Sequence, residues 1–377
     1  MSQTYLDNSA TTRVCGAAAD KAYRMMTETY GNPSSLHSLG FRAEQEVTAA
    51  RKAVAGLMGA QPEQVWFTSG GTEANNLAIF GAASARAREG RHIVTTAVEH
   101  ASVAAAIDQL EKQGYEVTRL VPDDSGFVDA PTIVDACRPD TVLVAVMMVN
   151  NETGARFPIE EAVGGIRQRA PHAHVHCDAV QAAGKLPLYA ERWNFDSMAV
   201  SAHKIHGPKG VGALYVRRGV RVLPRQFGGK QEGGIRPGTE AAPLIAAFGA
   251  AVGELPPPHR QMGHYDTLRR HLLARLEGVE GIHFHIPHYG VPYIIHLSVP
   301  GLKSETMLHF LAQREIYVSS GSACSKGAKS PVLTALGLPV DEIDSALRVS
   351  LCRDNTVEDM DRFAEALLEA MQTLARK

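Results

Sequence analysis

The sequence lacks any long apolar run and any excess of one charge. No run reaches the roughly 18 residues that a membrane-spanning helix needs, and the N-terminus has neither the basic region nor the apolar stretch of a signal peptide. The formal net charge of −2 gives no electrostatic basis for binding nucleic acid or an anionic membrane surface. These absences predict a cytoplasmic protein that binds small molecules or proteins.

Cysteine is sparse and scattered along the chain. No two cysteines have the spacing of a metal finger, and their odd number argues against a disulfide framework. The pattern therefore predicts a reducing compartment, no metal site, and thiols that are free for structural or chemical roles. The five are Cys15, Cys137, Cys177, Cys324 and Cys352.

The order of expected strands and helices predicts the fold class. A chain of 377 residues is too long for one small core. Strands alternate with helices from about residue 64 to 216, which indicates an α/β domain with a mostly parallel sheet between two layers of helices. Shorter strands and helices after residue 282 indicate a smaller α+β domain. We expect an N-terminal segment (1–15) packing with the small domain, a large domain (16–255) and a small C-terminal domain (256–377).

Lys204 lies in an unusual setting. It stands between two apolar runs that read as strands, and His203, His206 and Gly207 surround it. A lysine kept out of bulk water loses its proton readily and then becomes a candidate Schiff-base nucleophile. The alternative is a surface turn with an ordinary solvated charge.

A glycine pair marks a candidate phosphate site. An expected strand at 64–68 runs into Gly70, Gly71 and Thr72, and a small-residue helix follows. Backbone N–H groups at a helix N-terminus favour an anion. The spacing fits neither a Walker loop nor a dinucleotide fingerprint, so a single phosphate is the better interpretation. A plain glycine-rich turn is the alternative.

Polar side chains follow five consecutive expected strands. In parallel sheets, ligands bind beyond the carboxyl ends of the strands. A lysine nucleophile, one phosphate site and a carboxylate at a strand end together predict pyridoxal phosphate (PLP), whose pyridinium nitrogen pairs with a carboxylate. Asp178 suits that pairing, although a helix N-cap is its plainer role. His100 suits stacking or proton transfer, or else is a simple loop histidine. The polar residues are Ser69–Thr72, His100, Asn151, Asp178 with Gln181, and Ser201 with His203 and Lys204.

Two further residues carry expected chemistry nearer the C-terminus. Cys324 lies among small, polar residues, and Lys326 and Lys329 favour its thiolate. Arg348 has the fork geometry to bind a substrate carboxylate. A surface ion pair is the alternative for Arg348.

Motifs along nearly the whole chain resemble those of cysteine desulfurases of the NifS/IscS group, within the class V aminotransferase-like family of PLP enzymes. The matching stretches occur in the family's order. They are Tyr5–Thr12, Asn32–Ser35, Phe67–Asn76, Glu99–His100, Asn150–Gly154, Asp178–Gln181, Ser201–Gly210, Arg236–Thr239 and Ser320–Cys324.

The resemblance implies a PLP fold-type I homodimer with active sites at the subunit interface. Lys204 would hold the cofactor covalently, and Cys324 would take sulfur from L-cysteine as a persulfide, releasing L-alanine. A sulfur-acceptor protein would receive that sulfur for iron–sulfur clusters, thio-cofactors or tRNA thiolation. The implied phosphate ligands are Gly71, Thr72, Ser201 and His203, with Thr239 reaching in from the partner subunit. The implied ring ligands are His100, Asn151, Asp178 and Gln181, and the implied substrate ligands are Arg348, Asn151 and Asn8.

The sequence departs from the family pattern at several positions. Cys15 stands where an acidic residue is frequent, Cys352 where glycine is common, and Ser330 where glutamate is frequent. The alternatives are a selenocysteine lyase, another class V lyase or aminotransferase, and a non-catalytic sulfur-relay scaffold. A thiol in a Ser/Gly-rich stretch weighs against simple transamination. The combined presence of Lys204 and Cys324 weighs against a scaffold.

Overall fold

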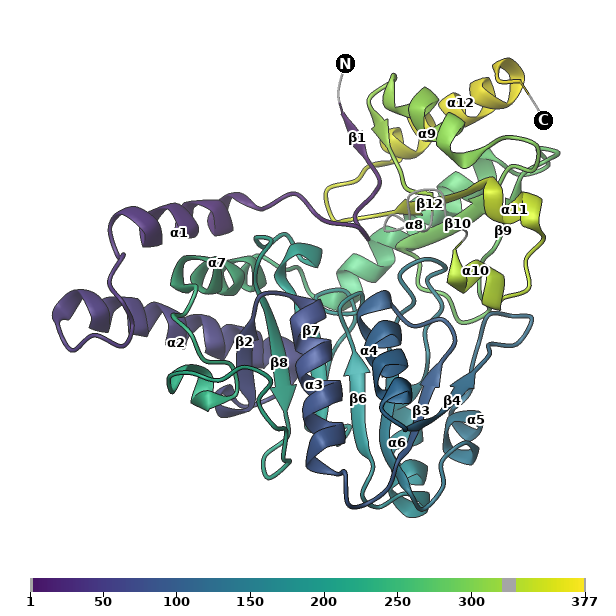
Figure 1. Cartoon of the computed structure of the whole chain (residues 1–377). Helices are drawn as coiled ribbons and strands as arrows, with labels where there is room; N and C mark the ends of the chain where they lie inside the picture. Colours follow the sequence, from purple (N-terminus) through teal and green to yellow (C-terminus); the bar gives the residue numbers. More distant parts are fainter. Residues whose placement is uncertain (1–2, 321–329, 376–377) are drawn as a thin grey trace.

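A computed structural model describes residues 3–320 and 330–375 and places a seven-stranded sheet at the centre of the larger part (Figure 1). The strand order is β2-β8-β7-β6-β5-β3-β4. β8 runs antiparallel to both of its neighbours, and the other neighbouring strands pair in parallel, as the sequence predicts. The strands are β2 (Val65–Thr68), β3 (His92–Thr96), β4 (Glu116–Leu120), β5 (Thr141–Met147), β6 (His174–Asp178), β7 (Ser197–Ser201) and β8 (Gly212–Val216).

Helices cover both faces of this sheet. The apolar run of β5 explains why, because Leu143 and Ala145 pack in one core while Val144 and Val146 pack in another. Side chains of a strand alternate between faces, so a strand covered on both sides is apolar throughout. The helices of the larger part are α2 (Ser38–Met58), α3 (Gly71–Ala85), α4 (Ala101–Lys112), α5 (Ala130–Asp135), α6 (Ile159–Arg169) and α7 (Ala242–Gly253).

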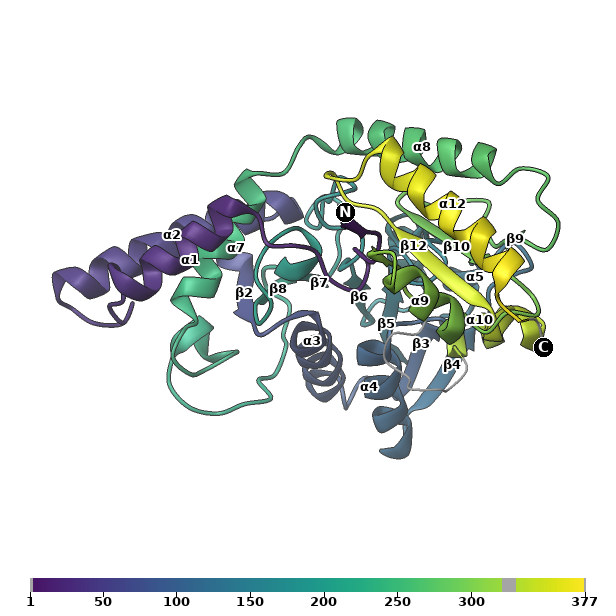
Figure 2. The same ribbon diagram turned by 90° about the horizontal axis from the view of Figure 1, so that it is seen from above.

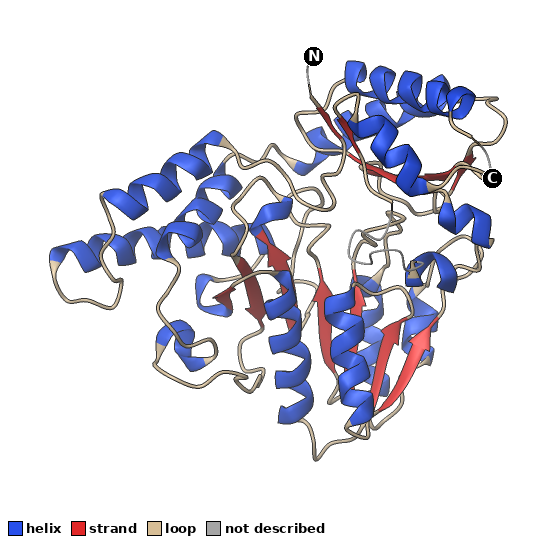
Figure 3. Ribbon diagram, turned by 45° about the horizontal axis from the view of Figure 1, so that its top comes forward, coloured by secondary structure: helices blue, strands red, loops and turns tan. Residues whose placement is uncertain are grey.

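The C-terminal part contains a second, antiparallel sheet of order β12-β10-β9, with α12 packed beside α8 and α9 (Figures 2 and 3). The N-terminal strand β1 (Thr4–Tyr5) pairs with β11 (Ile316–Tyr317), and Asp7 bridges Ser350. The N-terminal segment therefore packs against the C-terminal part of the chain. The domain boundaries stay a prediction. The remaining elements are α8 (Pro258–Arg275), β9 (His283–Phe284), β10 (Ile294–Ser298), α9 (Ser304–Ala312), α10 (Pro331–Ala335), α11 (Val340–Asp344), β12 (Ala346–Ser350) and α12 (Val357–Thr373).

Helix α1 (Gly16–Thr27) was not predicted from the sequence. Its N-cap, Cys15, makes no side-chain capping bond, and its buried residues are the small Ala18 and a single large apolar residue, Met25. Large apolar side chains point outward instead, with Tyr23 64% exposed and Met26 57% exposed. The usual signals of an amphipathic helix, a cap and a large apolar stripe toward the core, are therefore missing here. In the described part of the chain, no helix combines the length and the apolar character needed to cross a membrane.

A buried ion pair holds the glycine-rich loop at 228–239 against the sheet. Arg51 of α2 donates to both carboxylate oxygens of Glu232, at 2.8 and 2.6 Å, and Glu232 also accepts from the backbone of Phe67 at 2.8 Å. Glu232 is buried at 8% exposure. Removing one partner of such a pair leaves an uncompensated charge, so we expect Arg51→Ala to lower the free energy of unfolding by about 3 kcal/mol.

Urea unfolding of Arg51→Ala beside Arg119→Ala checks this prediction. Arg119 pairs with Asp108 and Glu111 at the surface, where an ion pair contributes about 0–1 kcal/mol. Equal losses in the two variants would contradict the assigned role of Glu232.

Candidate active site

Lys204 lies at the end of a short 3₁₀ turn (Ala202–Lys204) that directly follows β7. Its amino group donates to the backbone carbonyls of Ser9 and Ala10, the latter at 2.8 Å. Burial, followed by the positive charges of Arg348 and Lys185, lowers the pKa of Lys204 to about 7. The surface-turn alternative is therefore wrong, because this lysine is screened from water and close to neutrality.

A second buried lysine, which sequence reasoning did not single out, lies beside the first. Lys185 donates to the backbone carbonyl of Lys204 at 3.3 Å and lies 5.1 Å from the centre of the Tyr293 ring. Burial lowers the pKa of Lys185 to about 8. Nothing in the sequence around Lys185 distinguishes it. Its position matters because it contacts Lys204, which lies in the loop after the following strand, β7.

Asp178 and His100 are joined by a chain of buried hydrogen bonds. Asn75 of α3 donates to Asp178 at 2.7 Å and to the hydroxyl of Ser102 at 2.8 Å. That hydroxyl lies 2.8 Å from Nδ1 of His100, and the same Nδ1 accepts from the backbone N–H of Ser102 at 3.1 Å. Since Nδ1 accepts, the neutral ring carries its proton on Nε2. Burial lowers the pKa of His100, which keeps the ring neutral.

His176 fixes the orientation of the Asn75 amide. Its Nε2 lies 2.9 Å from Oδ1 of Asn75, and its Nδ1 lies 2.8 Å from the hydroxyl of Ser197. The amide oxygen only accepts, so Nε2 of His176 donates. Burial lowers the pKa of His176 to about 3, so the ring stays neutral and keeps this tautomer. Both N–H groups of Asn75 are thereby directed at Asp178 and Ser102.

The predicted phosphate residues gather where β2 runs into α3. Gly71 begins α3, and a Cβ added there would lie 2.8 Å from Cγ2 of Val180, so the close approach requires glycine. Ser201, at the end of β7, has a buried hydroxyl with no hydrogen-bond partner in the described ranges. Burial lowers the pKa of the neighbouring His203 to about 4. A neutral histidine, a free hydroxyl and a helix N-terminus are suitable donors for a phosphate.

For two predicted phosphate ligands, Thr72 and Thr239, the structure gives only a position in the fold. Thr72 is the second residue of α3, while Thr239 is exposed at the end of the glycine-rich loop. The exposure of Thr239 leaves it free for the proposed contact with a second subunit.

Arg348 is buried rather than at the surface. It is 2% exposed and donates to Asp7 and to the backbone carbonyl of Asn151, both at 2.8 Å. Its Nε has no partner among the residues that the structure describes. Asp7, which sequence reasoning did not select, thus occupies part of the fork that a substrate carboxylate would use.

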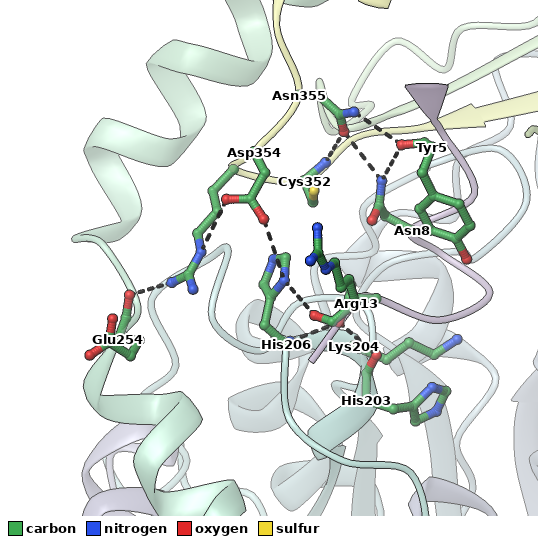
Figure 4. Close-up of polar contacts among 12 residues, drawn as sticks. Tyr5, Asn8, Arg13, His203, Lys204, His206, Glu254, Cys352, Asp354 and Asn355 are labelled. Carbon is green, nitrogen blue, oxygen red and sulfur yellow. Dashed lines mark hydrogen bonds and ion pairs between the residues drawn. The ribbon is translucent and has the colours of Figure 1, made fainter. Parts of the chain in front are cut away.

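The contacts of Asn8 connect the two ends of the chain. Its amide nitrogen donates to Tyr5, Ser350 and Asn355 at 2.9–3.2 Å (Figure 4). These acceptors hold the N-terminal segment against the C-terminal part, so the amide nitrogen is not available to a substrate. Asn8 therefore has this structural role through its amide nitrogen, while its role as a substrate ligand stays a prediction.

Cys324 lies outside the described residues, but both flanks of its segment are placed. Ser319 exchanges backbone hydrogen bonds with Arg348 at 2.7 and 3.2 Å. The hydroxyl of Ser330 donates to Glu152 at 2.5 Å, and burial raises the pKa of Glu152 to about 7. The described residues on either side of Cys324 are therefore held next to Arg348 and next to the strand end that carries Asn151.

Comparison with known proteins identifies the family. Residues 4–363 match the aminotransferase class-V family. The chain belongs to this family. It is 42% identical to cysteine desulfurase 2 of Trichormus variabilis over 381 residues, covering 99% of this chain and 94% of that protein.

Solved structures agree with this family. A NifS-like protein has a TM-score of 0.92 and 34% identity, covering 99% of this chain and 100% of that one. A structure described as SspA in complex with cysteine has a TM-score of 0.82 and 32% identity, covering 92% and 98% of the two chains. These relatives place the chain in the NifS/IscS-type group, whose fold is type I and whose cofactor is PLP.

The residues present fit that cofactor. Three buried side-chain atoms at the predicted site have no hydrogen-bond partner within the described ranges, namely Oδ1 of Asn151, Oε1 of Gln181 and the hydroxyl of Ser201. Buried polar atoms are nearly always paired in native proteins, so this concentration indicates a polar ligand. Lys204 would supply the amine, and Asp178 would supply the carboxylate for a ring nitrogen.

Proposed function

We propose that the protein is a PLP-dependent cysteine desulfurase that transfers sulfur from L-cysteine to Cys324. The observation that carries the proposal is the half-buried Lys204, with a pKa lowered to about 7, within electrostatic reach of Asp178 and Arg348. When bound, PLP supplies an electron sink for bond cleavage at the substrate. The chain supplies binding, proton movement and the sulfur acceptor.

The side chains divide this work. Asp178, held by Asn75, would keep a positive charge on the ring nitrogen of the bound cofactor, and His100 would contact its ring. The substrate carboxylate takes the place of the Asp7 carboxylate on the guanidinium of Arg348. Lys204 carries protons to and from the substrate carbon. The Cys324 thiolate attacks the substrate sulfur. The carbon–sulfur bond breaks, its electron pair goes to the substrate carbon with a proton, and L-alanine leaves while Cys324 keeps the sulfur as a persulfide.

A homodimer and a sulfur-acceptor protein complete the proposal. Exposed apolar side chains gather on the α1–α2 hairpin, where Tyr30 is 66% and Phe41 58% exposed, and on the glycine-rich loop, where Phe227 is 88% exposed. Apolar exposure of this extent supports an interface with a second copy. Thr239, on the same loop, would then complete the partner's phosphate site.

Incubation of the PLP-loaded protein with L-cysteine tests the proposed function. We expect sulfide and L-alanine in equal amounts in the presence of a thiol reductant that releases the persulfide. A parallel incubation with L-selenocysteine distinguishes a selenocysteine lyase, which would act on the selenium substrate alone. Formation of a keto acid in place of alanine would contradict the proposal in favour of an aminotransferase.

We expect Asp178→Asn to reduce the rate of alanine formation by about 10²–10³-fold, the range for removing one preorganised electrostatic partner. A neutral amide no longer holds a proton on the ring nitrogen, so the electron sink is weakened. Asp140→Asn is the control, because Asp140 pairs with Arg138 at the surface. Steady-state assays at saturating PLP measure the effect, and an unchanged kcat in Asp178→Asn would refute the assigned role.

A further inference from the structure

Three metal-ligating side chains meet outside the PLP site (Figure 4). They are His206, two residues after Lys204, and Cys352 and Asp354, which follow β12. One candidate ligand atom from each lies within 4.8 Å of the other two. The ligands come from two segments far apart in the sequence, so cysteine spacing did not reveal them.

The geometry leads us to propose that His206, Cys352 and Asp354 form a binding site for a divalent cation of the zinc class. A thiolate, an imidazole and a carboxylate are the ligands that zinc accepts, whereas calcium and magnesium require oxygen ligands. Three protein ligands leave a fourth position for water. The site goes beyond the proposed desulfurase activity and does not depend on it.

The histidine is already oriented for this role. Its Nδ1 lies 3.0 Å from the backbone carbonyl of Arg13, and its backbone N–H donates to Thr12 at 2.8 Å. A carbonyl only accepts, so Nδ1 carries the proton and Nε2 keeps its lone pair for a metal. Such a bond from the second ring nitrogen to a backbone carbonyl is the usual support of a metal-binding histidine. His206 is also held at a positive φ of 64°, which a non-glycine residue adopts only when its surroundings fix it.

The cysteine lies in a tight, braced turn. The backbone N–H of Cys352 donates to Oδ1 of Asn355 at 2.8 Å, and the side chain of Asn355 donates to the carbonyl of Tyr5 at 3.0 Å. Cys352 is buried, while the side chain of Asp354 is 66% exposed. The exposed carboxylate gives a cation access from solvent, and a bound cation would compete with the ion pair that Asp354 makes with Arg353 at 3.8 Å.

The remaining adjustment is small. Ligand atoms around a tetrahedral zinc ion lie about 3.3–3.8 Å apart, which follows from the usual bond lengths. Nδ1 of His206 lies 3.9 Å from Oδ2 of Asp354, so the carboxylate must shift to meet a cation held at Nε2 of the same ring. Lys185 and Arg353 add positive charge near the cluster, so we expect weaker binding than at a closed four-ligand site.

A bound cation would connect two parts of the active site. His206 belongs to the turn that carries Lys204, and Cys352 follows the strand that carries Arg348. We therefore expect zinc to raise the thermal midpoint of unfolding as well as to bind, since a ligand that prefers the folded state stabilises it.

Zinc titration of the gel-filtered holoenzyme tests the site. Every protein carries Cys324→Ser, which removes the other candidate zinc-binding thiol. We expect one Zn²⁺ per chain by calorimetry and by metal analysis after dialysis. Adding Cys352→Ser or Asp354→Asn should weaken binding at least tenfold and remove the shift in thermal midpoint. Adding Cys137→Ser should change neither, because that thiol donates to Ile133 elsewhere in the core.

Two results would overturn the site. One is the absence of zinc binding in the Cys324→Ser protein. The other is an affinity that either Cys352→Ser or Asp354→Asn leaves unchanged. Asp354 is exposed, so its substitution is compatible with folding, and the test therefore remains decisive if Cys352→Ser proves unstable.

Discussion

Lys204→Ala is expected to abolish both covalent retention of PLP and formation of alanine from L-cysteine. Alanine has no amine to bind the cofactor or to carry protons, and the other residues of the site retain PLP only by non-covalent contacts. Borohydride treatment of the PLP-loaded protein, followed by peptide mass analysis, should locate the cofactor on Lys204 in the wild type and nowhere in the variant.

Lys185→Met is the matched control for this experiment. Lys185 is also a buried lysine, and it contacts the backbone of Lys204. We expect this variant to keep PLP on Lys204, and we expect the loss of the neighbouring positive charge to raise the pKa of Lys204. Covalent labelling that survives in Lys204→Ala, or that is lost only in Lys185→Met, would reassign the cofactor lysine.

The sheet was predictable because its sequence signals are local. The uninterrupted apolar run of β5 shows that both faces are covered, and the polar residues after β6 and β7 mark the ligand edge. Helix α1 escaped prediction for the opposite reason. It buries one large apolar side chain, Met25, and exposes two, Tyr23 and Met26, and the proposed second subunit would explain that exposure.

The residues proposed to contact the cofactor were predictable from the sequence, but the residues that hold them in place were not. The sequence places Asp178 and His100 at strand ends, but their connection through Asn75 depends on a partner 103 residues away. The structural contact of Asn8 was missed for a similar reason, because its acceptor at Ser350 lies 342 residues along the chain. Hydrogen bonds of this range are set by the tertiary fold, and one sequence carries no local sign of them.

The two flanks of the Cys324 segment give the sulfur-transfer proposal its structural basis. Ser319 is bonded to Arg348, the proposed ligand of the substrate carboxylate, and Ser330 is bonded to Glu152, next to Asn151. A substrate whose carboxylate is bound at Arg348 is therefore bound beside one end of this segment.

Cys324→Ser is accordingly expected to keep PLP on Lys204 and to lose sulfur transfer. A serine hydroxyl is not ionised near neutral pH and forms no persulfide, so the carbon–sulfur bond of L-cysteine has no acceptor. Mass analysis after a single turnover with L-cysteine should show one added sulfur on the wild type and none on the variant. Cys15→Ser, which alters a half-buried thiol, should behave as the wild type. Undiminished alanine formation by Cys324→Ser would assign the attack to a different group, because the breaking bond requires a nucleophile that can accept neutral sulfur.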